Sequence, residues 1–166
     1  MKEKNLQHAE LVQLVIRNPV HWPAFGFGFG LMPFAPGTWG SLPGVALWWY
    51  LPKDIYLQSA VALAGFLVGI WFCGESARRI GVHDHGAIVW DEIIGMFLTL
   101  MAVPDSVHPA WVLVAFMLFR VADIWKPWPI RELDHSLRGG LGIMLDDVIA
   151  ALYAALILLF LQRIIV

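Results

Sequence analysis

The sequence predicts an all-α protein: a compact helical bundle with short membrane-embedded or membrane-associated helices. Hydrophobic residues fill 59% of its 166 positions and charged residues only 14%, whereas an average soluble domain has about 25% charged residues. With a mean hydropathy of +0.68, the chain has too few polar side chains to cover a globule in water. Its nine Trp agree with this, because Trp favours the boundary between water and lipid. A chain of this length is expected to form one domain, residues 1–166.

Apolar runs define the expected helices in chain order. Residues 6–17 place Leu and Val near helical spacing, which predicts a short amphipathic helix that ends at Asn18–Pro19. The runs 45–51 and 59–73 flank a polar Pro52-Lys53-Asp54 turn and predict a helical hairpin that dips into the bilayer. No run reaches the roughly 20 residues of a full membrane span without including charged positions, so partial insertion and a soluble, membrane-associating bundle both stay open. Further apolar helices are expected over residues 93–103, 110–122 and 148–161.

Residues 26–44 are rich in glycine and proline, and we expect a shaped loop there rather than a helix or strand. The stretch is not a nucleotide-binding fingerprint, because the third glycine is missing and no strand precedes it. Backbone amides around Pro36, Gly37 and Thr38 can cradle a phosphate. A turn at the membrane interface explains the same residues equally well.

One topology collects the polar segments on one side of a membrane. If each apolar run crosses or dips and returns, residues 26–44, 74–92 and 119–147 all face the same side. The opposite side then keeps only Lys53 and Arg163 as cations. The positive-inside tendency assigns the richer side to the cytoplasm. Its cations are Arg17, Arg78, Arg79, Arg120, Lys126, Arg131 and Arg138.

Acidic residues lie where apolar helices begin or end on that side. A single acid there is explained by helix capping, but paired acids beside apolar runs are costly unless they bind something. Several carboxylates on one surface repel one another unless a cation lies between them. Hard carboxylate oxygens favour magnesium over zinc. The predicted magnesium ligands are Asp91, Glu92, Asp123, Asp146 and Asp147.

Lys126 opens a rigid Lys-Pro-Trp-Pro exit from the apolar helix that carries Asp123. The spacing of the two residues allows an ordinary salt bridge on one helix face. Because Pro127 ends the helix there, Lys126 is equally well placed to bind phosphate oxygens as a point charge. Arg120 and Arg138 are the cations expected to assist it.

Other reactive side chains fit structural roles better. Cys73 and Arg79 have the C-x5-R spacing of cysteine phosphatases, but Cys73 ends an apolar run beside Glu75, which favours a buried packing cysteine. A single cysteine also excludes an intramolecular disulfide. His83 and His85 flank Asp84 and favour a solvated loop over a metal site. The net charge of −2 provides no basic surface for nucleic acid.

Three segments together resemble the phosphatidylglycerophosphatase A family of bacterial magnesium-dependent lipid phosphatases. The first, over residues 28–41, reads GFGLMPFAPGTWGS, and the second, over residues 88–95, reads IVWDEIIG. The third combines FRVADIWKPWPI over residues 119–130 with GLGIMLDD over residues 140–147. The similarity covers nearly the whole chain beyond residue 20, and the joint pattern is specific although no single piece is.

The resemblance implies hydrolysis of phosphatidylglycerophosphate to phosphatidylglycerol and phosphate, at a bacterial inner membrane and with the site facing the cytoplasm. It also implies an all-helical fold. We expect the five acids to hold one or two Mg²⁺ and to act with Lys126 in catalysis. Substrate contacts are expected from Pro36, Gly37, Thr38, Arg120 and Arg138.

Two other classes remain as alternatives. A CDP-alcohol phosphotransferase is also metal-dependent and acid-rich, and Gly142 precedes Asp146 with its spacing. However, Ala150 stands where its last Asp is expected, and its Asp-Gly and Ala-Arg pairs are absent. A non-catalytic membrane subunit or transporter would line a pathway with charges, whereas these charges gather at helix ends. The number of metal ions, the nucleophile or general base, the oligomeric state and activity on other lipid phosphates stay open.

Overall fold

The structure is a computed structural model that describes residues 8–82, 85–104, 108–130, 132, 137 and 139–165. Within these ranges every regular element is helical, which confirms the predicted all-α class. The elements are α1 (His8–Arg17), α2 (His21–Ala24), the 3₁₀ helix η1 (Gly26–Leu31), α3 (Pro36–Tyr50), α4 (Ile55–Ile80), α5 (Trp90–Leu100), α6 (Ala110–Trp125) and α8 (Gly140–Ile165).

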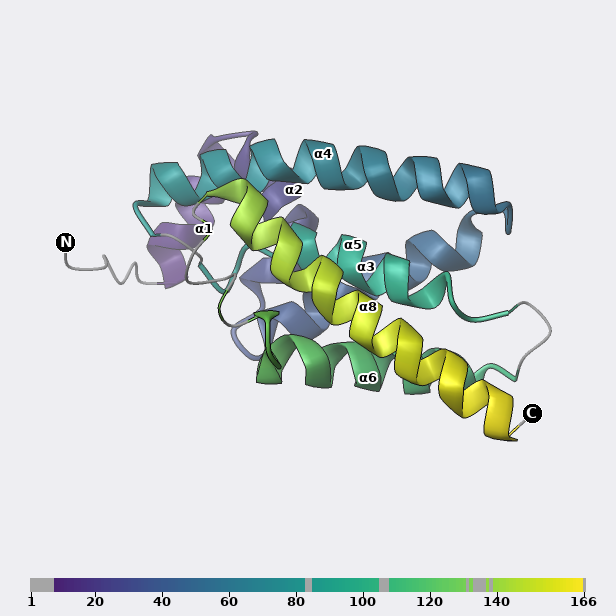
Figure 1. Cartoon of the computed structure of the whole chain (residues 1–166). Coiled ribbons are helices and arrows are strands. Elements are labelled where there is room, and N and C mark those ends of the chain that lie inside the picture. The colour runs from purple at the N-terminus through teal and green to yellow at the C-terminus, as the bar shows by residue number, and fades with distance from the viewer. Residues whose placement is uncertain are drawn as a thin grey trace.

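Helix α5 is the centre of the bundle. It packs against α3, α4, α6 and α8, and α8 crosses α4, α5 and α6 (Figure 1). The sequence WDEIIGMFLTL explains this position, since a helix that is apolar on all sides has to be buried. Only its first turn carries acidic residues, Asp91 and Glu92. The fold thus places two carboxylates at one end of its most buried helix.

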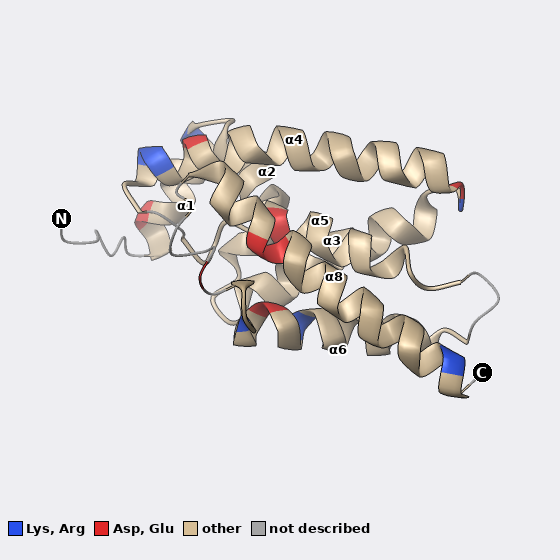
Figure 2. Cartoon of the chain, viewed as in Figure 1, with Lys and Arg blue, Asp and Glu red and all other residues tan. Residues whose placement is uncertain are grey.

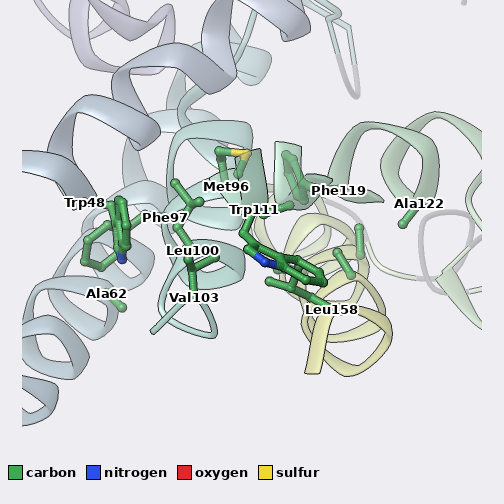
Figure 3. Close-up of a cluster of buried hydrophobic side chains, with 14 of the residues drawn as sticks. Trp48, Ala62, Met96, Phe97, Leu100, Val103, Trp111, Phe119, Ala122 and Leu158 are labelled. Carbon is green, nitrogen blue, oxygen red and sulfur yellow. The ribbon is translucent and has the colours of Figure 1, made fainter. Parts of the chain in front are cut away.

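Two apolar clusters form the core. The larger one joins α3, α5, α6 and α8, with Phe97, Leu100, Phe119 and Leu158 fully buried (Figure 3). The second lies between α1, α2, α4 and the start of α8. It contains Cys73, whose Sγ lies 3.9 Å from Met144 Sδ, as expected for a cysteine that packs between helices.

The prediction of a loop over residues 26–44 is wrong. The structure has η1 in its first part and the first nine residues of α3 in its last part. Pro36 fits the first turn of a helix, where its missing N–H is not needed. A Cβ at Gly40 would overlap Val89, and one at Gly44 would overlap the carbonyl of Ile93. These glycines therefore let α3 lie directly against α5.

Residues 45–51 and 59–73 are helical as predicted, and a short turn joins α3 to α4, but the two helices pack against α5 rather than against each other as a hairpin. Helix α4 continues to Ile80, where Gly81 caps it in a left-handed conformation, and Glu75 forms ion pairs with Arg78 and Arg79 in its last turns. Helix α8 begins well before the expected residue 148, at Gly140, where a Cβ would overlap the carbonyl of Ile70 on α4. Both helices have 26 residues, and in the described ranges they are the two that are long and apolar enough to cross a membrane.

Charge is distributed unevenly along the bundle. Acidic residues gather where α5 begins and α6 ends, with a further pair in the second turn of α8 (Figure 2). At the other end of the bundle, where α3 leads into α4 and where α8 ends, the described cations are Lys53 and Arg163 (Figure 2). This matches the predicted arrangement, in which one end of the helices carries most of the charge.

Candidate metal and phosphate site

Asp91 and Glu92 on α5 meet Asp147 on α8. One carboxylate oxygen from each residue lies within 4.8 Å of the other two. Gly95 makes this approach possible, since a Cβ there would lie 3.1 Å from the carbonyl oxygen of Asp147 and 2.7 Å from the ring of Phe119. Asp91 is 7% exposed and Asp147 is 2% exposed. Three carboxylates distant in sequence thus share one buried volume.

Two oxygens of this cluster lack hydrogen-bond partners. Among the described residues, neither Glu92 Oε2 nor Asp147 Oδ2 has one, and both atoms are buried. Burial raises the pKa of Glu92 well above its usual value, and the charges of Asp147 and Asp123 raise it further, while Arg120 opposes them. An unpaired buried carboxylate is costly. The three residues therefore have the donor set and the spare oxygens to hold a hard divalent cation.

Arg120 and Asp123 border the cluster from the last turns of α6. Arg120 Nη1 donates to Asp123 Oδ2 at 2.5 Å and lies 3.8 Å from Glu92 Oε1. The Asp123 carboxylate is near enough to Glu92 and Asp147 to act on both electrostatically. The guanidinium of Arg120 thus bridges two of the acids and offsets part of their repulsion.

Lys126 joins the end of α6 to α8. It adopts a left-handed conformation with φ of 45° as the C-cap of α6, so the helix ends at the expected place. Its Nζ lies 2.7 Å from Asp146 Oδ2, and Asp146 Oδ1 accepts a hydrogen bond of 3.0 Å from the Asp147 amide. Lys126 therefore pairs with Asp146, the residue next to Asp147 of the carboxylate cluster.

The pair Asp146-Asp147 lies in the second turn of α8, not before the last helix as predicted. Helix capping therefore does not explain these acids, which point into the bundle from a helix interior. The helix starts earlier because the small residues Gly140 and Gly142 fit closely against neighbouring backbone: at Gly142 a Cβ would overlap the carbonyl of Leu137. Interior carboxylates of this kind are rare unless they have a partner or a ligand.

Pro36, Gly37 and Thr38 form the first turn of α3 rather than a free turn. A Cβ at Gly37 would overlap Glu92 Oε1 and lie 2.8 Å from Arg120 Nη2. The N-terminus of α3 is therefore in direct contact with the acidic site. The Thr38 amide already donates to the Ala35 carbonyl at 3.0 Å, so it is not a spare donor.

The structure does not place the remaining residues discussed from the sequence in the carboxylate site. Arg138, His83 and Asp84 lie outside the described residues. His85 Nδ1 accepts a hydrogen bond of 3.2 Å from the Ala87 amide, which is a local structural role. Sequence reasoning missed Gly95, although a glycine inside an otherwise apolar helix is a recognisable signal of close packing.

Comparison with known proteins decides between the remaining classes. The family model described as phosphatidylglycerophosphatase A matches residues 22–162. The chain belongs to this family. It is 48% identical over 151 residues to phosphatidylglycerophosphatase A of Escherichia coli K12, covering 89% of this chain and 86% of that protein. It is 46% identical over 154 residues to phosphatidylglycerophosphatase A of Haemophilus influenzae, covering 92% and 94%.

A more distant relative carries a different substrate in its name. A Bacteroides thetaiotaomicron protein with the provisional name phosphatidylinositol-3-phosphatase is 39% identical over 140 residues, covering 80% of this chain and 87% of its own length. No solved structure matches the chain. Membership of the phosphatidylglycerophosphatase A family makes the chain a phosphatase. Its two long apolar helices have the length and composition to cross a membrane.

Proposed function

We propose that this chain is a magnesium-dependent lipid phosphatase that hydrolyses the terminal phosphomonoester of phosphatidylglycerophosphate, giving phosphatidylglycerol and phosphate. The observation that carries the proposal is the meeting of Asp91, Glu92 and Asp147, with two spare buried oxygens, beside the cations Lys126 and Arg120. A phosphomonoester needs both features. Its negative charge has to be neutralised, and its oxygens need fixed donors.

The carboxylate cluster is the proposed place for magnesium. Asp91, Glu92 and Asp147 would be its ligands, because their oxygens lie together and two buried carboxylate oxygens of the cluster accept no hydrogen bond from the described residues. Asp123 and Asp146, next to them, complete the set of five acids. When bound, magnesium supplies positive charge for phosphate oxygens and for activation of water.

The cations next to the cluster would bind and orient the phosphate. Lys126 is held by Asp146, so its ammonium group is fixed before substrate arrives. Arg120 is held by Asp123, and its buried Nε has no hydrogen-bond partner in the described part of the chain. Helix α3 begins at the same place, and the N-terminus of a helix favours an anion. Fixed donors of this kind lose little entropy when the phosphate binds.

The bacterial inner membrane is the proposed location, with the site facing the cytoplasm. The site lies at the end of the bundle that carries most of the described charge, whereas Lys53 and Arg163 lie at the other end. The positive-inside tendency supports this orientation. A site at the ends of membrane helices also matches the depth of a lipid headgroup.

Phosphate release from defined lipids tests the proposal. Purified protein in detergent micelles should release phosphate from phosphatidylglycerophosphate, lose this activity in EDTA and regain it with excess Mg²⁺. Mg²⁺ should also raise the melting temperature of the protein, a readout that needs no turnover. Release that persists in EDTA would contradict the metal requirement.

Substrate choice needs separate lipids in the same assay. The Bacteroides relative makes phosphatidylinositol 3-phosphate the second candidate substrate. A higher kcat/KM for this lipid than for phosphatidylglycerophosphate would replace the proposed substrate. A strict requirement for a CDP-lipid would instead favour the transferase class, and no release from any lipid phosphate would favour a non-catalytic subunit.

A further inference from the structure

Lys126 borders a cavity as well as the carboxylate cluster. The cavity has a volume of about 470 Å³ and is lined by Trp125, Lys126, Pro127, Trp128 and Glu132. Its walls come from the Lys-Pro-Trp-Pro segment, whereas the proposed magnesium ligands lie on α5 and α8. Lys126, the proposed phosphate-binding residue, therefore lies between this cavity and the carboxylate cluster.

The cavity walls are held in place by several contacts. The left-handed conformation of Lys126 turns the chain sharply after α6, and its amide donates to the Ala122 carbonyl at 2.9 Å. Tyr153 Oη on α8 donates to the Trp128 carbonyl at 2.8 Å. Ile130 is fully buried, and its amide donates to the Pro127 carbonyl at 2.8 Å. The two indoles are therefore presented by a braced segment.

These indoles are more exposed than the other tryptophan side chains of the chain. Trp125 is 78% exposed and Trp128 is 72% exposed, and neighbouring Ile124 is 72% exposed. Large apolar side chains gathered on one surface mark a place where something apolar binds. Trp in particular combines an apolar ring with an N–H donor and suits the headgroup region of a bilayer.

The chemistry of the lining selects the kind of ligand. Two aromatic rings and a proline offer apolar surface, Lys126 offers one positive charge, and Glu132 offers a hydrogen-bond acceptor. An acyl chain would contact the indoles and the proline but would make no polar contact with either charged side chain of the lining. An inorganic anion would leave the indoles exposed. A polyol that is attached to an anionic phosphate and to a lipid can contact the indoles, the ammonium group of Lys126 and the carboxylate of Glu132.

We propose that this cavity binds the part of the lipid substrate that does not react, namely the headgroup glycerol and the start of the phosphatidyl group. The indoles of Trp125 and Trp128 contact its carbon atoms, and Glu132 accepts a hydrogen bond from the free hydroxyl of the headgroup glycerol. A carboxylate repels a phosphodiester, which places the hydroxyl rather than the phosphodiester beside Glu132. Lys126 then directs the terminal phosphomonoester toward the carboxylate cluster. This inference rests on the proposed function and extends it to substrate selection.

The inference makes the cavity a specificity device. Phosphatidic acid carries its phosphomonoester directly on the diacylglycerol, so it has no headgroup glycerol to fill the cavity. The enzyme should therefore prefer phosphatidylglycerophosphate, and the preference should depend on Trp125, Trp128 and Glu132. Binding energy from a non-reacting part of a substrate acts mainly through KM when it is the same in the ground and transition states.

Two measurements test the cavity. The first is equilibrium binding of phosphatidylglycerol in detergent micelles, because this product retains the headgroup glycerol and needs no turnover. Trp125→Ala and Trp128→Ala should each weaken binding about tenfold, the loss expected for one large aromatic contact. Glu132→Gln should weaken it about threefold, as for one exposed hydrogen bond. Trp128→Phe, which keeps a ring, should lose less than Trp128→Ala.

The second measurement is steady-state kinetics on two lipids. Trp125→Ala and Trp128→Ala should raise KM for phosphatidylglycerophosphate about tenfold and Glu132→Gln about threefold, with kcat within about twofold of wild type. All three variants should reduce the advantage of this lipid over phosphatidic acid. The matched control is Trp71→Ala, since Trp71 is also an exposed tryptophan, 58% exposed, but lies on α4 outside the cavity. This control should leave binding and kinetics unchanged.

The outcomes separate this inference from the proposed function. Hydrolysis of phosphatidylglycerophosphate with unchanged Kd and KM in the cavity variants would overturn the cavity assignment alone. Equal effects from Trp71→Ala would overturn it too, because they would indicate a general loss of membrane contact. If the wild type hydrolyses no lipid but phosphatidylglycerol binding weakens in the cavity variants, the proposed function fails and the cavity assignment stands.

Discussion

Lys126 Nζ lies 2.7 Å from Asp146 Oδ2, although the two residues are 20 positions apart in the sequence. The pair links the C-cap of α6 to the second turn of α8. Asp146 has a side chain that is only 6% exposed, and that of Lys126 is 25% exposed. Because a partly buried ion pair is screened weakly by solvent, this contact fixes the ammonium group beside the carboxylate cluster.

The first prediction concerns this pair as a unit. Lys126→Ala should lower kcat/KM by about 100-fold, the usual loss when a fixed donor to a reacting oxyanion is removed. Asp146→Asn should lower it as well, because Lys126 then loses its orientation. The double variant should cost much less than the product of the two single effects, since both act through the same ammonium group. Fully multiplicative losses in kcat/KM would show that the two residues act independently.

The second prediction concerns the buried acids. Asp91→Asn and Asp147→Asn should abolish detectable turnover, because a neutral amide removes one of the negative charges that hold a hard divalent cation in this cluster. Expression should be intact, and the melting temperature in EDTA should not fall, since each change removes one charge from a group of repelling carboxylates. Activity assays and thermal unfolding of the purified variants check both parts.

Asp54→Asn is the matched control for these variants. Asp54 caps α4 at the other end of the bundle, where its carboxylate accepts a hydrogen bond of 2.8 Å from the Leu57 amide. Asn caps a helix about as well as Asp, so turnover should equal that of the wild type. Wild-type turnover from Asp91→Asn or Asp147→Asn would remove these acids from the site.

The error over residues 26–44 shows how local composition misled the sequence reasoning. Six glycines and three prolines favour a loop on propensity alone. Yet Gly37, Gly40, Ser41 and Gly44 are all buried and recur at the three- and four-residue spacing of one helix face. That spacing was visible in the sequence. Propensity could not reveal what these small residues pack against, namely α5, and this packing stabilises the helix.

The acidic residues were easier to find than their arrangement. Charges between apolar runs are costly, so Asp91, Glu92 and Asp147 could be singled out without a structure. Their grouping depends on how closely α5 and α8 approach at Gly95, which sequence spacing does not specify. The pairing of Lys126 with Asp146 likewise depends on the left-handed conformation of Lys126. Relative helix positions, not residue types, were the missing information.

The third prediction uses Gly37, where α3 touches the site. In Gly37→Ala the added methyl group would overlap the Glu92 carboxylate and crowd the Arg120 guanidinium. Displacement of catalytic groups by a fraction of an ångström should lower kcat/KM by about 100-fold. Gly86→Ala is the control, because a Cβ at Gly86 has no atom within 4 Å. Kinetics and melting temperatures of both variants check this, and equal activities would show that the Gly37 contact is unimportant.

The fourth prediction concerns the anchoring of the N-terminal helices. His21 on α2 is 1% exposed, and its Nδ1 is hydrogen-bonded to Ser76 Oγ on α4 at 2.5 Å. Burial lowers the pKa of His21 below 6.5, and Arg79 lowers it further, while Glu75 opposes them. The unfolded chain therefore binds this proton more readily than the folded chain.

The contribution of neutral His21 to stability is therefore fully present above pH 6.5, the pKa of the unfolded chain. It is lost progressively as the pH falls from 6.5 toward the lower pKa of the folded protein. The melting temperature of the wild type should fall as the pH drops from about 7 to about 5. In His21→Gln this dependence should be weaker, because the side chain no longer titrates, although the variant starts less stable at neutral pH. The comparison isolates one group, since every other titratable side chain is the same in both proteins. Identical pH dependence in the two proteins would mean that protonation of His21 does not loosen the contact between α2 and α4.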